Sequence, residues 1–160
     1  MKPPVLPATT LQSGCYYSMF YGCTSLTTAP ELPITALQGS CYRSMFQGCT
    51  ALTTPPELPA TTLQSSCYRQ MFQGCTSLTT APGLPATTLI SDCYRSMFLG
   101  CSNLSHIKAM FTTTPSTSYT RDWVSGVATT GTFIKNSVAQ WDVSGVNGVP
   151  SGWTVETASE

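Results

Sequence analysis

A repeat of 26 residues constrains the fold of this 160-residue chain more than any other feature. Aligning the chain with itself at an offset of 26 gives four units, 6–31, 32–57, 58–83 and 84–109. All four share the skeleton L-P-x-T-x-L-x3-C-Y-x2-M-F-x-G-C-x2-L, and the second and third are identical at 19 of 26 positions. A fixed period of this size is typical of a solenoid, whose units bury their apolar faces by stacking on one another. Residues 1–109 are therefore expected to form a repeat domain. In this domain the end of a partial repeat, at 3–5, precedes the four complete units.

The order of residues within a unit predicts one helix and one strand per coil. The segment 41–48 places apolar side chains at helical spacings, which predicts about two turns of helix ended by Gly48 in the left-handed conformation. The threonine-rich stretch 52–54 predicts a short strand, and the prolines of 55–59 predict an extended connection. The expected fold class is an α/β repeat solenoid of the leucine-rich-repeat type, with a short parallel strand and a short helix per coil.

The eight cysteines form two columns at the repeat spacing. The C-x7-C spacing within a unit resembles neither a zinc motif nor a C-x-x-C redox motif, so no metal and no redox site is expected. Two interpretations remain open: disulfides between cysteines of adjacent coils, which would be about 4.8 Å apart, or columns of buried free thiols. The columns are Cys15, Cys41, Cys67 and Cys93, and Cys23, Cys49, Cys75 and Cys101.

Rows of hydroxyl side chains provide the candidate binding surface. They follow the expected strand position in each unit, where they could contact a protein or a glycan or could simply keep the surface soluble. The rows consist of Thr27, Thr28, Thr53, Thr54, Thr79, Thr80 and Ser105.

A tyrosine column and an arginine column are expected on the convex surface. Stacked guanidinium groups repel one another unless they are solvated or lie on the aromatic rings, and both conditions fit an outer surface, where the arginines could also contact an anionic partner. The columns are Tyr16, Tyr42, Tyr68 and Tyr94, with Arg43, Arg69 and Arg95 following and Tyr17 in the first unit.

The segment 110–160 lacks the repeat skeleton and is expected to cap the last coil. Exposed solenoid ends need atypical terminal segments, and large aromatic side chains are suited to cover them. The expected covering residues are Trp123, Phe133, Trp141 and Trp153. Within this segment the sequence predicts a short helix at 119–124 and strands at 131–135 and 152–156.

Composition argues against several functions. Charged residues make up 9% of the chain, with seven basic and seven acidic side chains, so there is no basic surface for nucleic acid. No apolar run has the roughly 20 residues that span a bilayer, and no signal peptide is apparent. The single histidine, His106, has no acidic partner in a recognisable motif. An enzyme is therefore not expected, nor is a cofactor.

The run 45–54, M-F-Q-G-C-T-A-L-T-T, and its copies resemble the BspA-like leucine-rich repeats of bacterial cell-surface proteins. The resemblance covers all four units, with Met in place of Ala before Phe and with a second cysteine. It implies a non-enzymatic binding or adhesion module within a longer exported protein, located outside the cell or on its surface. The alternative is a structural spacer or fibre segment, bacterial or phage-associated. In either case the uncapped N-terminal repeat could associate end to end with another copy.

Overall fold

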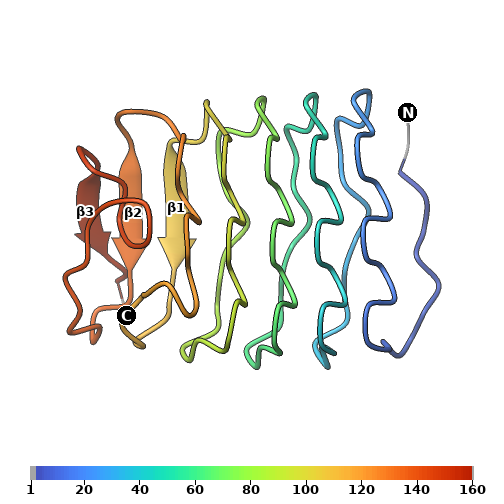
Figure 1. Cartoon of the computed structure of the whole chain (residues 1–160), viewed down its shortest axis with the longest axis horizontal. Coiled ribbons are helices and arrows are strands. Elements are labelled where there is room, and N and C mark those ends of the chain that lie inside the picture. Colours follow the sequence, from blue (N-terminus) through green and yellow to red (C-terminus); the bar gives the residue numbers. More distant parts are fainter. Residues whose placement is uncertain (1–2, 160) are drawn as a thin grey trace.

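The chain winds into a stack of coils whose axis runs from one terminus to the other (Figure 1). The structure is a computed structural model and describes residues 3–159. These residues contain no helix, and their strands are three short parallel ones in a single sheet. The expected α/β fold class with one helix per coil is therefore wrong. Backbone hydrogen bonds join residues about 26 positions apart, which places equivalent residues of adjacent coils side by side.

In place of the expected helices, each coil contains a run of consecutive tight turns. We call these runs turn ribbons; they span 14–23, 40–49, 66–75 and 92–101. Along a ribbon, alternate residues bond in two different directions. Arg43 N donates to Ser40 O within its own coil, at 3.2 Å, whereas Ser44 N donates to Arg69 O of the next coil, at 2.8 Å. An α-helix would use every N–H within the segment, so the bonds between coils have displaced the helix.

Left-handed residues every four positions explain why the apolar spacing imitated a helix. In the second ribbon Ser40, Ser44 and Gly48 have φ of 55°, 55° and 76°. Each left-handed residue ends one turn and starts the next, so the side chains repeat with a period of four rather than 3.6. Pairs of buried residues recur every four positions, as at 41–42 and 45–46. The left-handed conformation of Gly48 was predicted correctly, but the helix that it was expected to end does not exist.

The core consists of the inward side chains stacked in columns along the axis. The rings of Phe46 and Phe72 lie parallel with centroids 5.6 Å apart, and those of Tyr42 and Tyr68 with centroids 6.0 Å apart. These tyrosines are 1–2% exposed, so the column expected on the convex surface lies in the core. Parallel, offset rings at this distance add stabilisation to their apolar burial.

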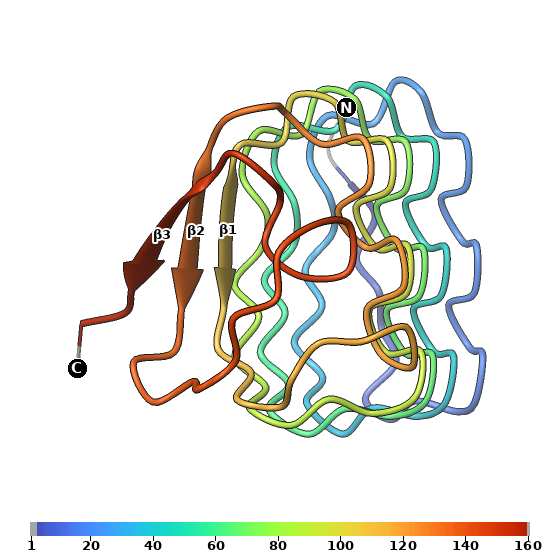
Figure 2. The ribbon, with the colours of Figure 1, turned by 60° about the vertical axis from the view of Figure 1, so that its left-hand side comes forward.

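The three strands lie together at the C-terminal end, on the side of the stack opposite the ribbons (Figure 2). β1 (His106–Ala109), β2 (Thr132–Lys135) and β3 (Thr154–Thr157) pair in that order, all parallel. β2 and β3 confirm the strands expected near these positions.

The strand expected in every unit is wrong for the earlier coils. Among the described residues these coils have isolated bridges, such as Thr28 with Thr54, but no named strand. Prolines follow each threonine pair and end the pairing, because proline has no N–H to donate.

A fifth turn ribbon follows at 118–126, within the segment expected to cap the repeats. Phe98 N donates to Trp123 O at 2.9 Å, which continues the pattern of the preceding coils, and no helix forms at 119–124. Trp123 is fully buried against Tyr94 and Phe98. Its indole Nε1 donates to Gly148 O, at 2.9 Å, in the loop that closes this end.

Candidate functional site

The threonine rows lie along one edge of the strand side. Thr53 N donates to Thr27 O at 2.9 Å, and Thr53 Oγ1 donates to the same oxygen at 3.2 Å. Thr80 pairs with His106. Of the seven hydroxyl residues in the candidate surface, Thr28 and Ser105 are half-buried and the other five are exposed. Part of their hydrogen-bonding capacity is therefore used between coils, and the remainder faces solvent.

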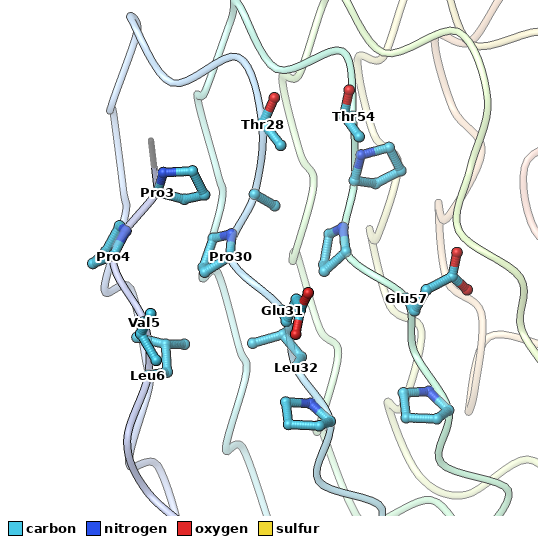
Figure 3. Close-up of a pocket in the computed structure, with 15 residues that line it drawn as sticks. Pro3, Pro4, Val5, Leu6, Thr28, Pro30, Glu31, Leu32, Thr54 and Glu57 are labelled. Atoms are coloured by element: carbon cyan, nitrogen blue, oxygen red, sulfur yellow. The ribbon is translucent and has the colours of Figure 1, made fainter. Parts of the chain in front are cut away.

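A groove opens beside these threonines, and sequence analysis did not identify it. It has a volume of about 720 Å³ and crosses the first three coils (Figure 3). Its walls are the proline-rich segments 3–7, 29–33 and 55–59, which together with 81–85 we call the proline seam. Figure 3 shows Thr28 and Thr54 at one end of the groove, with Glu31 and Glu57 on adjacent coils further along it. The lining is mainly proline, leucine and alanine, and it includes no aromatic side chain.

Proline limits pairing along the seam. Its last segment, 81–85, pairs with the next coil, which has no proline here: Leu84 N donates to Lys108 O at 3.1 Å, and Met110 N donates to Leu84 O at 2.9 Å. Within the described part of the chain, Glu31 and Glu57 make no such backbone hydrogen bond to the neighbouring coil. The prolines around them supply no N–H, so adjacent coils cannot form a ladder here.

Among the described residues, the charged side chains that line the groove are two glutamates. Glu31 and Glu57 occupy equivalent positions of adjacent coils and are exposed. Two carboxylates on adjacent coils give this part of the groove a negative charge. A smaller hollow of about 350 Å³ continues past Glu57 to Gly83 and Lys108. The face is therefore acidic at its start and gains a lysine near β1.

The arginine column lies on the outer surface of the turn ribbons. The guanidinium carbon of Arg43 lies 5.3 Å from the centre of the Tyr17 ring, as expected for a stacked cation. The other two arginines share a carboxylate instead, because Asp92 Oδ2 lies 3.7 Å from Arg69 and 3.5 Å from Arg95. Burial lowers the pKa of Arg69, and the neighbouring positive charges of Arg43 and Arg95 lower it further.

All eight cysteines are free thiols in this structure. Cys15 and Cys23 in the first coil are exposed, and the other six are fully buried. In the second column the thiols have a repeated partner: Cys75 Sγ donates to Phe46 O at 3.1 Å, and Cys101 Sγ to Phe72 O at 3.0 Å. Burial raises the pKa of Cys101 to about 12, because the thiolate would lose its solvation. Such thiols are poor nucleophiles at neutral pH.

Within residues 3–159 no group of three metal-ligating side chains comes together. No helix in the same range could cross a lipid bilayer. His106 begins β1 and is half-buried. The motif P-P-E-L-P and its copies mark the proline-rich segments in the sequence, but glutamate is present in only two of the four copies, so the motif does not by itself reveal a groove.

Comparison with protein-family models, with curated proteins and with solved structures found no match for this chain.

Proposed function

We propose that this protein is a non-enzymatic binding module that holds an extended polypeptide in the groove of the proline seam. The observation that carries the proposal is the groove itself, which combines an apolar lining with unpaired backbone and two carboxylates. A ligand site of this kind is concave, largely apolar and marked by a few polar groups. The threonines at its edge supply hydroxyls that can bond to the same ligand.

A polypeptide fits this groove better than a glycan does. The seam near Glu31 and Glu57 has backbone groups that bond to no neighbouring coil, and an extended peptide can pair with them as an added strand does. The lining has no aromatic ring on which a sugar could stack. The two carboxylates favour a peptide that carries lysine or arginine among apolar residues, because opposite charges attract.

The resemblance of the repeat to BspA-like cell-surface repeats supports a location outside the cell or on its surface, as part of a longer exported protein. It supports adhesion as the role of this binding. The threonine rows (Thr27, Thr28, Thr53, Thr54, Thr79, Thr80 and Ser105) remain part of the proposed contact surface.

The test is binding of the purified chain to an array of random octapeptides, with a glycan array in parallel. We expect enrichment of peptides with basic and apolar residues. The double variant Glu31→Gln/Glu57→Gln should lose the preference for basic residues. Glu156→Gln is the matched control, because Glu156 is exposed on the same strand side but lies outside the groove. Binding to glycans but not to peptides would overturn the polypeptide assignment. If Glu156→Gln lost the preference for basic residues as much as the double variant does, the role of the groove would be overturned.

A structural spacer is the second candidate, and the regularity of the stack favours it. Ring centroids along the phenylalanine column are 5.5, 5.6 and 5.8 Å apart, so successive coils are nearly interchangeable. A spacer needs a defined length and no ligand. Negative results on both arrays would favour this candidate over a binding module.

A further inference from the structure

The N-terminal end of the stack leaves apolar side chains of the first ribbon exposed. Met19 is 48% exposed, and Cys15 and Cys23 are exposed beside it. Their equivalents in the next coil, Cys41, Met45 and Cys49, are all 0% exposed because the first ribbon covers them. Within the described residues these exposed side chains therefore form one side of the coil-to-coil interface that recurs throughout the molecule.

The backbone groups of the first ribbon that leave the coil point in fixed directions, with N–H groups toward the second coil and carbonyl groups toward the exposed face. In the first ribbon the N–H groups that leave the coil all donate to the second coil, as in Phe20 N to Met45 O at 2.9 Å. The carbonyls on the opposite side accept no backbone hydrogen bond within the described residues. The N–H donors are Gly14, Tyr16, Ser18, Phe20 and Gly22, and the free carbonyls belong to Ser13, Cys15, Tyr17, Met19 and Tyr21.

This arrangement excludes two simple partners. The edge of a β-strand presents N–H and C=O groups alternately, so it would oppose some of these carbonyls with carbonyls. A second copy placed face to face would oppose the whole row with an identical row. Unpaired carbonyls buried in either interface would cost free energy.

The other end of the molecule cannot supply the missing donors. There Asp122 N donates to Asn147 Oδ1 at 2.8 Å, and Val124 N donates to Val146 O at 3.3 Å. The outgoing N–H groups at 122 and 124 of the last ribbon are thus already bonded within the chain. Head-to-tail association of intact copies would require this closing loop to leave.

We propose that the N-terminal face binds a further turn ribbon of the same 26-residue repeat, which presents its N–H side to the free carbonyls. Such a ribbon supplies donors alone, at the spacing that the free carbonyls require. Its inward side chains would continue the cysteine, methionine and phenylalanine columns. The interface would be the one that already joins each coil to the next.

The experiment uses the full chain and a synthetic peptide with the sequence of residues 32–57, in which both cysteines are replaced by alanine. Alkylation of Cys15 and Cys23 by iodoacetamide is followed by mass spectrometry as peptide is added. We expect saturable protection, with alkylation slowed about tenfold or more because buried thiols react poorly. A scrambled peptide should give none.

Two further peptides test the hydrogen bonds. An ester in place of the amide at Phe46 removes an N–H that faces the next coil, and it should weaken binding about two- to tenfold. An ester at Ala51, whose N–H bonds to no backbone carbonyl in the described structure, should bind like the parent peptide. Equal binding of all three peptides would overturn the proposal, because the face would then require apolar cover alone.

A second experiment covers the case in which the free peptide is too disordered to bind, by joining the repeat covalently to the chain. The same cysteine-free repeat is inserted in front of Leu6, and the alkylation of Cys15 and Cys23 is measured again. Protection of both thiols is expected. Unchanged reactivity in the joined chain would overturn the proposal, as would protection of the unextended chain that appears simply on raising its own concentration.

Discussion

The turn ribbons and the proline seam are opposite sides of the same coils, and they differ in how the backbone is hydrogen-bonded between coils. On the ribbon side, alternate N–H groups bond to the next coil in every repeat, as with Gly48 N to Gln73 O at 2.8 Å. On the seam side, prolines such as Pro55 and Pro56 remove the donors, and a groove opens between coils. The ribbons hold the stack together, and the seam leaves backbone groups near Glu31 and Glu57 without a bond to the neighbouring coil.

The difference shows that repetition alone does not create a sheet. Where β1 replaces the seam with the proline-free sequence His106–Ala109, the strand side pairs and continues through β2 and β3. The presence or absence of proline decides whether adjacent coils pair by hydrogen bonds on this side.

Alkaline pH should have the largest effect, and it should act on the ribbon side, which holds all the thiols. Burial raises the pKa of Cys93 to about 11 and that of Cys101 to about 12, from 9.0 in an exposed thiol. Above pH 9 the unfolded chain loses these protons while the folded chain keeps them, so stability falls as pH rises. Cys101 alone should cost roughly 1 kcal/mol per pH unit between pH 9 and 12.

We expect unfolding by pH 11, measured by circular dichroism with urea melts at pH 7, 9 and 10. The variant Cys101→Ala should show a shallower decline above pH 9. A free energy of unfolding that stays flat from pH 8 to 10.5 would contradict the assignment of these cysteines as buried thiols.

Truncation in the ring column should have the next largest effect. Phe72 is fully buried between Phe46 and Phe98, with centroids 5.6 and 5.8 Å away. Phe72→Ala should lower the free energy of unfolding by about 3–5 kcal/mol, because it removes apolar burial and leaves a cavity. Urea denaturation measures the loss. Phe72→Leu is the control and should cost less than about 2 kcal/mol; equal costs would mean that the column is loosely packed.

A pair of glycine substitutions compares the two sides directly and should have the smallest effect. Gly74, in a ribbon, has φ of +75°, whereas Gly83, in the seam, has ordinary φ and open space around its Cα. Gly74→Ala should cost about 1–2 kcal/mol because alanine is strained in the left-handed region. Gly83→Ala should change stability by less than about 0.5 kcal/mol. Equal melting temperatures for the two variants would show that alanine at Gly74 causes no measurable strain.

The sequence predicted which residues share a column more successfully than it predicted the backbone between them. The period of 26 placed Phe46 and Phe72 at equivalent positions, and their rings stack. The helix was mispredicted because a four-residue turn period and a 3.6-residue helical period differ little over eight residues. The left-handed serines, Ser40 and Ser44, could not be foreseen, since serine carries no strong signal for that conformation.

The fifth ribbon was missed although a signal for it existed. Arg121 and Gly126 continue the arginine and glycine columns at the repeat spacing, but the apolar skeleton around them has changed. The site was foreseen in part. The threonine row was recognised from its repetition, whereas the groove depends on how far prolines separate neighbouring coils, which no local pattern states.

The one-way direction of the backbone ladder gives the stack an electrical polarity. Each peptide unit that bonds between coils carries a dipole of about 3.5 D, and in the ribbons these dipoles align along the stack axis, coil after coil. Because the free carbonyls lie at the N-terminal end, that end is negative, the reverse of an α-helix. The aligned dipoles therefore favour positive charge beside the first ribbon, a polarity that the balance of seven basic and seven acidic side chains does not reveal.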